Sequence, residues 1–259
     1  HALAAARQGY RVTVFERNER AIGASIRNFG MVWPVGQPFG PLRDRALRSR
    51  QIWLELAALG NFFRDPVGSL HLAYHPDELA VIEEFVDGAK DATVQVLTPD
   101  QVAQKSSAAV TTGLLGALWS ETEVIVDARE AIVSVAEVLR SSFNVDFRFG
   151  ATVTEINAPH FTVNGETWKA DHLFVCSGAD FETLYPDLYQ NSGLTKVKLQ
   201  MMRTSPQPNH YRIGPALCGG LTLTHYAAFS DCPSLPALKQ RIQQELPFAV
   251  DWHIHVMMS

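Results

Sequence analysis

The hydrophobic pattern at the start of the chain predicts a helix followed by a strand. Residues 1–8 are rich in alanine, and Gly9 stands where the end of a helix favours a left-handed residue. The run YRVTVFE, residues 10–16, is β-branched and aromatic, as strands are. A helix, a glycine and a strand in this order form the second half of a βαβ unit, which predicts a parallel sheet.

Hydrophobic periodicity and capping or turn residues predict the helices and strands of the rest of the chain. Asp127 is expected to cap a long amphipathic helix, Asn164-Gly165 is typical of a two-residue hairpin, and residues 173–176 suit a fully buried strand. The predicted helices cover residues 41–60, 76–90, 99–106, 128–143, 181–189 and 234–246. The predicted strands or extended runs cover residues 68–75, 94–98, 116–120, 122–128, 145–156, 160–170, 195–206, 216–229 and 245–259.

Composition narrows the class of protein. The 259 residues are 46% hydrophobic and 19% charged with a net charge of −5, which indicates a globular protein of one or two domains. The mild acidity and the lack of a dense Lys/Arg run argue against a nucleic-acid partner, and no apolar run reaches the roughly 18 residues that span a bilayer. Cys176, Cys218 and Cys232 lack the spacing of a zinc site or a redox dithiol, so we expect no metal and free thiols in a reducing cytoplasm.

Two stretches near the start are candidates for ligand contact. Glu16 ends the first strand, where a carboxylate can accept hydrogen bonds from ribose hydroxyls; an exposed strand-end acid is the alternative. The following run AIGASIRNFGMVWPVG is apolar and rich in small residues. Ser25 is a candidate cap for a short helix facing phosphate, and Gly30 and Met31 precede an apolar segment, which suggests a buried flat ligand.

A third stretch lies far along the chain. Ser177 and Gly178 form a small-residue turn after the predicted strand 173–176, at the end of the strand where α/β folds place ligands. A plain β-turn is the alternative. Among Arg43, Arg45, Arg48 and Arg50, one is a candidate for an anionic ligand, whereas each taken singly is more often a solvated surface residue.

Together these motifs resemble the FAD-dependent amine oxidoreductases of the D-amino-acid oxidase, glycine oxidase and sarcosine oxidase superfamily. The strand ending in Glu16, then GASIRNFGMVWP, ALRSRQIWLEL, GSLHLA, VDAREAI, GATVTEI and LFVCSGAD follow the order and spacing of that superfamily. The combination of RNFGMVWP, ALRSRQIWLEL and LTLTHYAAF resembles a branch associated with aminophosphonates. The glycine turn for the FAD pyrophosphate and the closing C-terminal segment are missing, so we expect an internal fragment that binds FAD poorly by itself.

The resemblance implies a fold and a reaction. It implies an α/β FAD-binding domain with a Rossmann-like parallel sheet over residues 1–60 and 122–190, and a mostly antiparallel α+β substrate-binding domain over residues 61–121 and 191–259. It also implies hydride transfer from a small amine to flavin N5, followed by imine hydrolysis, with oxygen or another electron acceptor reoxidising the flavin. The alternatives are an NAD-dependent dehydrogenase and a truncated or degenerate relative that keeps the fold without flavin.

The resemblance also implies site residues. For FAD these are Glu16 at the ribose, Arg17 at the adenine edge, Ser25, Arg27 and Asn28 at the phosphate or ribityl chain, Gly30 and Met31 at the isoalloxazine, Val153 at the adenine, and Ser177 and Gly178 at the adenosine. A small anionic amine substrate needs a cation or several donors, for which Arg50, Arg203, His225 and Tyr226 are candidates. His225 and Tyr226 are expected within a sheet over the flavin, with packed core residues as the alternative.

Overall fold

The computed structural model describes residues 1–89 and 92–259, and the chain divides into two compact units. Unit 1 comprises His1–Gly30, Leu56–Phe63 and Asp127–Arg203, and unit 2 comprises Met31–Glu55, Arg64–Val126 and Thr204–Ser259. The predicted domain boundaries differ from these mainly at residues 31–55, which strand pairing and side-chain contacts join to unit 2. The functional roles of the two domains stay predictions.

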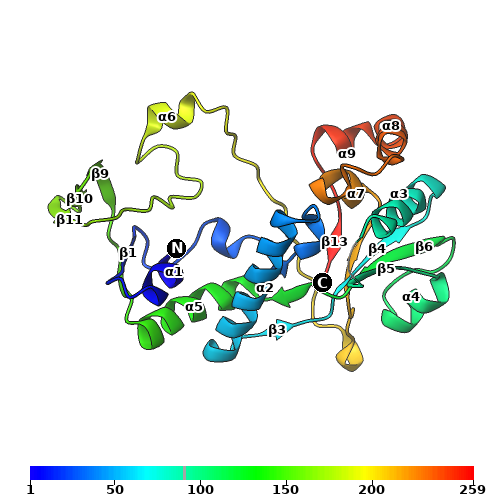
Figure 1. Ribbon diagram of the computed structural model, residues 1–259, viewed down its shortest axis with the longest axis horizontal. Helices are drawn as coiled ribbons and strands as arrows, with labels where there is room; N and C mark the ends of the chain where they lie inside the picture. The colour runs from blue at the N-terminus through cyan, green and yellow to red at the C-terminus, as the bar shows by residue number, and fades with distance from the viewer. Residues whose placement is uncertain (90–91) are drawn as a thin grey trace. The chain divides into compact units, whose positions relative to one another are not determined.

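The helices and strands follow most of the predicted pattern (Figure 1). The α-helices are α1 (Ala2–Arg7), α2 (Pro41–Gly60), α3 (Pro76–Asp87), α4 (Pro99–Lys105), α5 (Ala128–Phe143), α6 (Pro186–Gln190), α7 (Leu221–His225), α8 (Leu235–Glu245) and α9 (Pro247–Asp251). The 3-10 helices are η1 (Ala24–Ile26), η2 (Pro34–Gly36), η3 (Pro208–His210) and η4 (Ala227–Phe229). The strands are β1 (Thr13–Glu16), β2 (Met31–Val32), β3 (Arg64–Asp65), β4 (Ser69–Ala73), β5 (Val94–Leu97), β6 (Gly116–Ser120), β7 (Val124–Val126), β8 (Asp146–Phe149), β9 (Val153–Asn157), β10 (His160–Val163), β11 (Glu166–Lys169), β12 (Ala216–Cys218) and β13 (Met257–Met258).

Unit 1 has the predicted parallel pairing. β1 pairs with β8 in parallel, α1 and α5 pack together, and Gly9 has a φ of +83° after α1, as the helix–glycine–strand pattern predicts. The Asp127 side chain caps α5 by accepting a hydrogen bond from the Arg129 backbone N–H, and Asn164 and Gly165 both have positive φ in the hairpin between β10 and β11. The predicted cap and hairpin are therefore confirmed.

Aromatic packing joins β1 to the β9–β10–β11 sheet of unit 1. The ring of Phe15 lies edge-on to Phe161 at 5.6 Å and to Trp168 at 5.1 Å. Phe161 and Val163 are buried in the same cluster. This contact brings the end of β1, where Glu16 lies, against the hairpin sheet.

Two predicted strands are not formed. Residues 173–176 are irregular and mostly exposed, with Phe174 63% exposed, and residues 195–206 are likewise irregular. A buried strand needs a neighbour for its backbone N–H and C=O groups. In the described part of the chain neither segment joins a sheet, so burial would leave those groups without partners.

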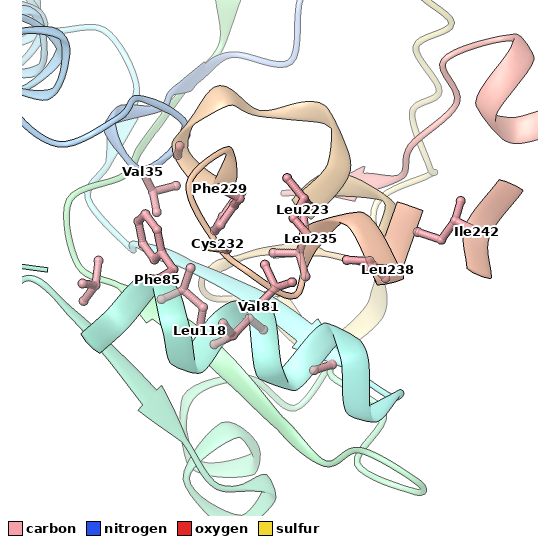
Figure 2. Close-up of a cluster of buried hydrophobic side chains, with 14 residues drawn as sticks. Val35, Val81, Phe85, Leu118, Leu223, Phe229, Cys232, Leu235, Leu238 and Ile242 are labelled. Atoms are coloured by element: carbon pink, nitrogen blue, oxygen red, sulfur yellow. The ribbon is translucent and has the colours of Figure 1, made fainter. Parts of the chain in front are cut away.

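Unit 2 is built on a five-stranded sheet in the order β13-β12-β4-β6-β5. β4 pairs with β6 antiparallel and with β12 in parallel, and every residue of β4 is buried. Side chains of α3, α7, η4 and α8 form the core: in Figure 2, Val81 and Phe85 of α3 point towards Phe229 and Leu235. The mixed α/β class with a parallel-containing sheet and antiparallel sheets is therefore confirmed.

The C-terminal part of unit 2 corrects a prediction. Residues 221–229, expected to be extended, form α7 and η4, and residues 247–251 form α9. Leu223 and Phe229 are fully buried in the core from this helical conformation. Tertiary packing has therefore overridden the local β preference of this threonine-rich run. The predicted last residue of the helix 76–90 lies outside the described residues.

A buried carboxylate holds η2 against the sheet of unit 2. Glu123 is fully buried; its Oε1 accepts hydrogen bonds from the Val35 backbone N–H at 2.9 Å and the Thr122 hydroxyl at 2.8 Å. Its Oε2 accepts one from the Ser69 hydroxyl of β4 at 3.1 Å. Removing this side chain would take one acceptor away from each of the three donors.

We predict that Glu123→Ala lowers the free energy of unfolding by about 3 kcal/mol, because it removes the acceptor of three buried donors, and of these Thr122 still has the Ser120 hydroxyl at 3.1 Å. Glu121→Ala is the matched control, since Glu121 is exposed two residues earlier, and it should cost less than about 0.5 kcal/mol. Urea unfolding followed by circular dichroism measures both values. Equal losses in the two variants would contradict the role given to Glu123.

The helices of residues 1–89 and 92–259 include none with the length and apolar character to cross a membrane.

Candidate functional site

The end of β1 presents an ordered carboxylate. Glu16 Oε1 accepts hydrogen bonds from the Asn18 backbone N–H at 2.9 Å and from the Asn18 side-chain amide at 2.8 Å. Glu16 is half-buried at the carboxyl end of a strand that pairs in parallel. The side chain is therefore held in one orientation at the edge of the sheet where α/β folds bind ligands.

The next residue joins β1 to the turn that follows residue 176. Arg17 Nη1 donates to Asp180 Oδ2 at 2.7 Å and lies 3.4 Å from the Thr183 hydroxyl. Hydrogen bonds from Thr183, together with the charge of Arg17, lower the pKa of Asp180 to about 2. Asp180 is therefore ionised at neutral pH, and its pair with Arg17 places the two predicted ligand-binding segments side by side.

The turn itself has a buried hydroxyl and a glycine in a left-handed conformation. Ser177 Oγ is buried and has no hydrogen-bond partner among the described residues. Gly178 has a φ of +61°, and among the described residues nothing lies within 4 Å of the place that a Cβ would take. A buried hydroxyl usually has a partner, because its desolvation costs about 1–3 kcal/mol. Ser177 and Glu16 thus fit the polar part of a ligand that follows this edge of the sheet.

The loop after β1 is ordered by one asparagine. Asn28 donates from Nδ2 to the Ala24 and Ser25 carbonyls at 3.1 and 2.9 Å and accepts at Oδ1 from the Gly30 backbone N–H at 2.9 Å. Ser25 lies inside η1 and makes no cap, because Gly23 occupies the N-cap position. The prediction that Ser25 caps a helix is wrong, and Asn28 has a structural role in the loop that the sequence pattern did not indicate.

The other predicted cofactor residues lie in different elements. Gly30 is buried with a φ of +68°, Arg27 is exposed after η1, and Met31 begins β2 in unit 2. Val153 begins β9 and packs in the cluster that contains Phe15. Their contacts with FAD stay predictions.

The predicted substrate-binding residues lie in several elements, and His225 and Tyr226 are neighbours in the sequence. His225 ends α7 and Tyr226 follows it, with ring centroids 5.1 Å apart. Arg50 of α2 donates from Nε to the Thr122 carbonyl at 2.6 Å, so this side chain has a structural partner. Arg203 is exposed in an irregular segment of unit 1.

The expected position of His225 and Tyr226 in a sheet is wrong, because residues 221–225 are helical. Tyr226 is half-buried, and its hydroxyl lies 3.6 Å from the sulfur of Met257. Burial, with a contribution from Cys218, raises the pKa of Tyr226 to about 12. Tyr226 is therefore a neutral hydroxyl at physiological pH.

A buried histidine in the sheet of unit 2, His71, was not among the predicted site residues. His71 is fully buried in β4, and neither ring nitrogen has a hydrogen-bond partner among the described residues; the same holds for Trp33 Nε1. The rings of Trp33 and Phe229 lie 5.7 and 5.8 Å from that of His71. Burial lowers the pKa of His71 to about 3. The sequence feature that could have identified His71 is its position inside the otherwise apolar run GSLHLA.

The sequence matches the family described as FAD dependent oxidoreductase (DAO) over residues 1–228. The chain belongs to the DAO family. The paired edge of β1 and the turn at Ser177 lie within the matched range. The cofactor of this family is FAD. The oriented carboxylate of Glu16 and the buried hydroxyl of Ser177 are groups that could bond to a ribose, and their contacts with FAD stay predictions.

Solved structures support the fold of this DAO-family chain. Glycine oxidase from Bacillus cereus ATCC 14579 matches with 22% identity and a TM-score of 0.55, covering 65% of this chain and 50% of that one. L-proline dehydrogenase from P. horikoshii matches with 15% identity and a TM-score of 0.61, covering 100% and 75%. Iminodiacetate oxidase from Chelativorans sp. BNC1 matches with 22% identity and a TM-score of 0.51, covering 66% and 49%. The chain thus spans about half the length of the first and third of these proteins.

A search of curated proteins found no match. The three cysteines are free thiols, with Cys176 exposed and Cys218 and Cys232 buried. In residues 1–89 and 92–259, no three His, Cys, Asp or Glu side chains form a group that could hold a metal ion.

We predict that acid weakens the protein through His71. Because the pKa of His71 falls from 6.5 to about 3 on folding, the unfolded chain binds the extra proton, and stability is lost as pH falls below 6.5. At pH 4 the loss is about 3 kcal/mol relative to neutral pH. His71→Leu should remove that part of the pH dependence, whereas His160→Leu, at an exposed site in β10, should keep it. Urea unfolding between about pH 4 and 7 measures the slopes, and identical slopes for parent and His71→Leu would refute the assignment.

Proposed function

We propose that the complete protein is an FAD-dependent oxidoreductase that oxidises the C–N bond of a small amine or amino acid. The observation that carries this proposal is the DAO-family match over residues 1–228. Structures named glycine oxidase, iminodiacetate oxidase and L-amino acid deaminase share the fold, and these names all refer to small amino or imino acids. The proposed substrate belongs to the same chemical class.

FAD, when bound, supplies the two-electron redox chemistry, and the protein binds and orients the reactants. Glu16 accepts hydrogen bonds from the ribose hydroxyls of the adenosine, with its orientation fixed beforehand by Asn18. Ser177 supplies its buried hydroxyl to the same part of the cofactor, and Gly178 lets the backbone approach closely. The Arg17 guanidinium is paired with Asp180, and this pair supports its proposed place at the adenine edge.

The substrate side of the proposal is a small amine with an anionic group. His225 and Tyr226 are the proposed contacts, with ring centroids 5.1 Å apart, and the neutral Tyr226 hydroxyl is a hydrogen-bond donor for a carboxylate or phosphonate. Resemblance to the aminophosphonate-associated branch makes an N-methylated or hydroxylated aminophosphonate one candidate. The imine formed by oxidation hydrolyses in water, and oxygen or another acceptor takes up the electrons.

One observation favours a second candidate, a relative that keeps the fold without binding flavin. The segment 173–176, which lies before the turn at Ser177, is irregular and exposed. A ligand at the edge of an α/β sheet is held best where the strands beside it are formed. Flavin absorbance in the blue from the purified full-length protein supports the first candidate, and a colourless, correctly folded protein supports the second.

We predict that Glu16→Gln weakens FAD binding by the full-length protein about tenfold, because a neutral amide is a poorer acceptor for ribose hydroxyls than a carboxylate. Glu19→Gln is the matched control: Glu19 is exposed three residues later, and its substitution removes the same charge. Titrating the apoprotein with FAD and following flavin fluorescence gives both dissociation constants. Equal affinities for Glu16→Gln and the parent would remove Glu16 from the proposed site.

The substrate class is tested with a panel on the full-length, flavin-loaded protein. Glycine, sarcosine, D-amino acids and aminophosphonates are supplied in turn, and loss of the flavin absorbance without oxygen reports substrate oxidation. Bleaching by at least one member supports the proposed reaction. A protein that holds flavin but is bleached by none of them would contradict the substrate class while leaving the cofactor assignment intact.

A further inference from the structure

Unit 2 contains a cavity whose lining is rich in basic side chains. The cavity has a volume of about 250 Å³ and lies between α7, α8, α9 and the segment that follows α9. The basic side chains in its lining are His225 of α7, Lys239 of α8, and His253 and His255 after α9. Apolar residues such as Leu221, Ile242 and Val250 complete the wall. The space is large enough for a small organic anion.

Two of the histidines form a stacked pair. The rings of His225 and His255 have centroids 4.1 Å apart and planes 25° apart. Two imidazolium ions at this distance repel each other, so a second proton on the pair requires a counter-charge. Burial and the neighbouring His225 lower the pKa of His255 to about 4, and burial with a contribution from His253 lowers the pKa of His225.

The cavity lining is basic and apolar. Its residues that the structure describes include no Asp or Glu. Of the acids on the same helices, Glu245 of α8 bonds to Arg241 at 2.8 Å, and Asp251 is exposed at the end of α9. The ring of Tyr226 lies edge-on to both stacked histidines, at 5.1 and 6.0 Å. The fixed charge in the lining is therefore that of Lys239.

We propose that this cavity binds a small oxyanion, a carboxylate or a phosphonate, between Lys239 and the His225–His255 pair. The ammonium of Lys239 attracts the anion, and the anion in turn provides the counter-charge that lets the stacked imidazoles take up a proton and donate N–H hydrogen bonds. Lys239 would repel a metal cation, which favours an anion as the occupant.

The oxyanion has two sources, the acid group of the amine substrate or a free anion. Binding itself does not depend on the proposed function; only the identification of the oxyanion with part of the substrate rests on it. The first test is therefore a binding experiment that needs no turnover.

Sulfate is the probe, because it keeps the same charge across the pH range of histidine. Isothermal titration of the full-length protein should show saturable binding that is tighter at about pH 6 than at about pH 8, with proton uptake revealed by two buffers of different ionisation enthalpy. Lys239→Gln should weaken binding about tenfold. His225→Gln and His255→Gln should abolish the proton uptake.

The controls are Lys198→Gln and His160→Gln, exposed residues that do not line the cavity; both should bind sulfate like the parent. Urea unfolding of each variant checks that the fold is kept. No saturable sulfate binding, or equal binding by Lys239→Gln and the parent, would overturn the proposal.

Steady-state kinetics with an amine that the protein oxidises then shows whether the oxyanion is the acid group of the substrate or a free anion. If the substrate's acid group occupies the cavity, sulfate inhibits competitively and Lys239→Gln raises KM with little change in kcat. If a free anion occupies it, sulfate changes the rate without competing, and Lys239→Gln removes that effect. A protein that binds sulfate as described but oxidises no amine would refute the proposed function and keep the anion site.

Discussion

The backbone of β4 forms hydrogen-bonded ladders with β12 on one side and β6 on the other, and the organisation of unit 2 depends on this double pairing. A strand can enter a core only when its N–H and C=O groups have partners. With both edges paired, β4 is buried along its whole length and carries Ser69 and His71 into the interior. The helix α3 packs its apolar face on this sheet, and α8 packs on α3.

The same need for backbone hydrogen-bond partners keeps an apolar segment of unit 1 out of the core. Residues 173–176 are as apolar as a buried strand, yet they remain exposed because the described chain gives them no neighbouring strand. The turn after them is nevertheless in place, since Arg17 and Asp180 hold it against the end of β1. The Arg17–Asp180 ion pair therefore links the strand of the predicted ribose-binding acid to the Ser177 turn without a completed sheet between them.

Polar side chains in unit 2 differ in how deeply they are buried and in how many hydrogen bonds they make. Glu123 is buried with three donors and stabilises the fold, whereas His71 is buried without hydrogen-bond partners among the described residues and stays neutral. The histidines of the α7–α9 cavity are exposed or half-buried, and in the proposed anion site they change protonation when a ligand binds. The position of a histidine, within the buried sheet or in the cavity lining, therefore decides whether it can respond to an anion.

The sequence by itself determined the local elements and the family. Glycine after α1, Asp127 before α5 and Asn164-Gly165 between β10 and β11 act through neighbouring residues, so their structures could be predicted without the fold. Glu16 and Ser177 were identified as candidates for the same reason, by their place after apolar runs. Tertiary structure alone decided that 221–229 is helical and that His225, Lys239 and His255 share a cavity. Those outcomes depend on contacts between segments far apart in the chain, which local preferences do not encode.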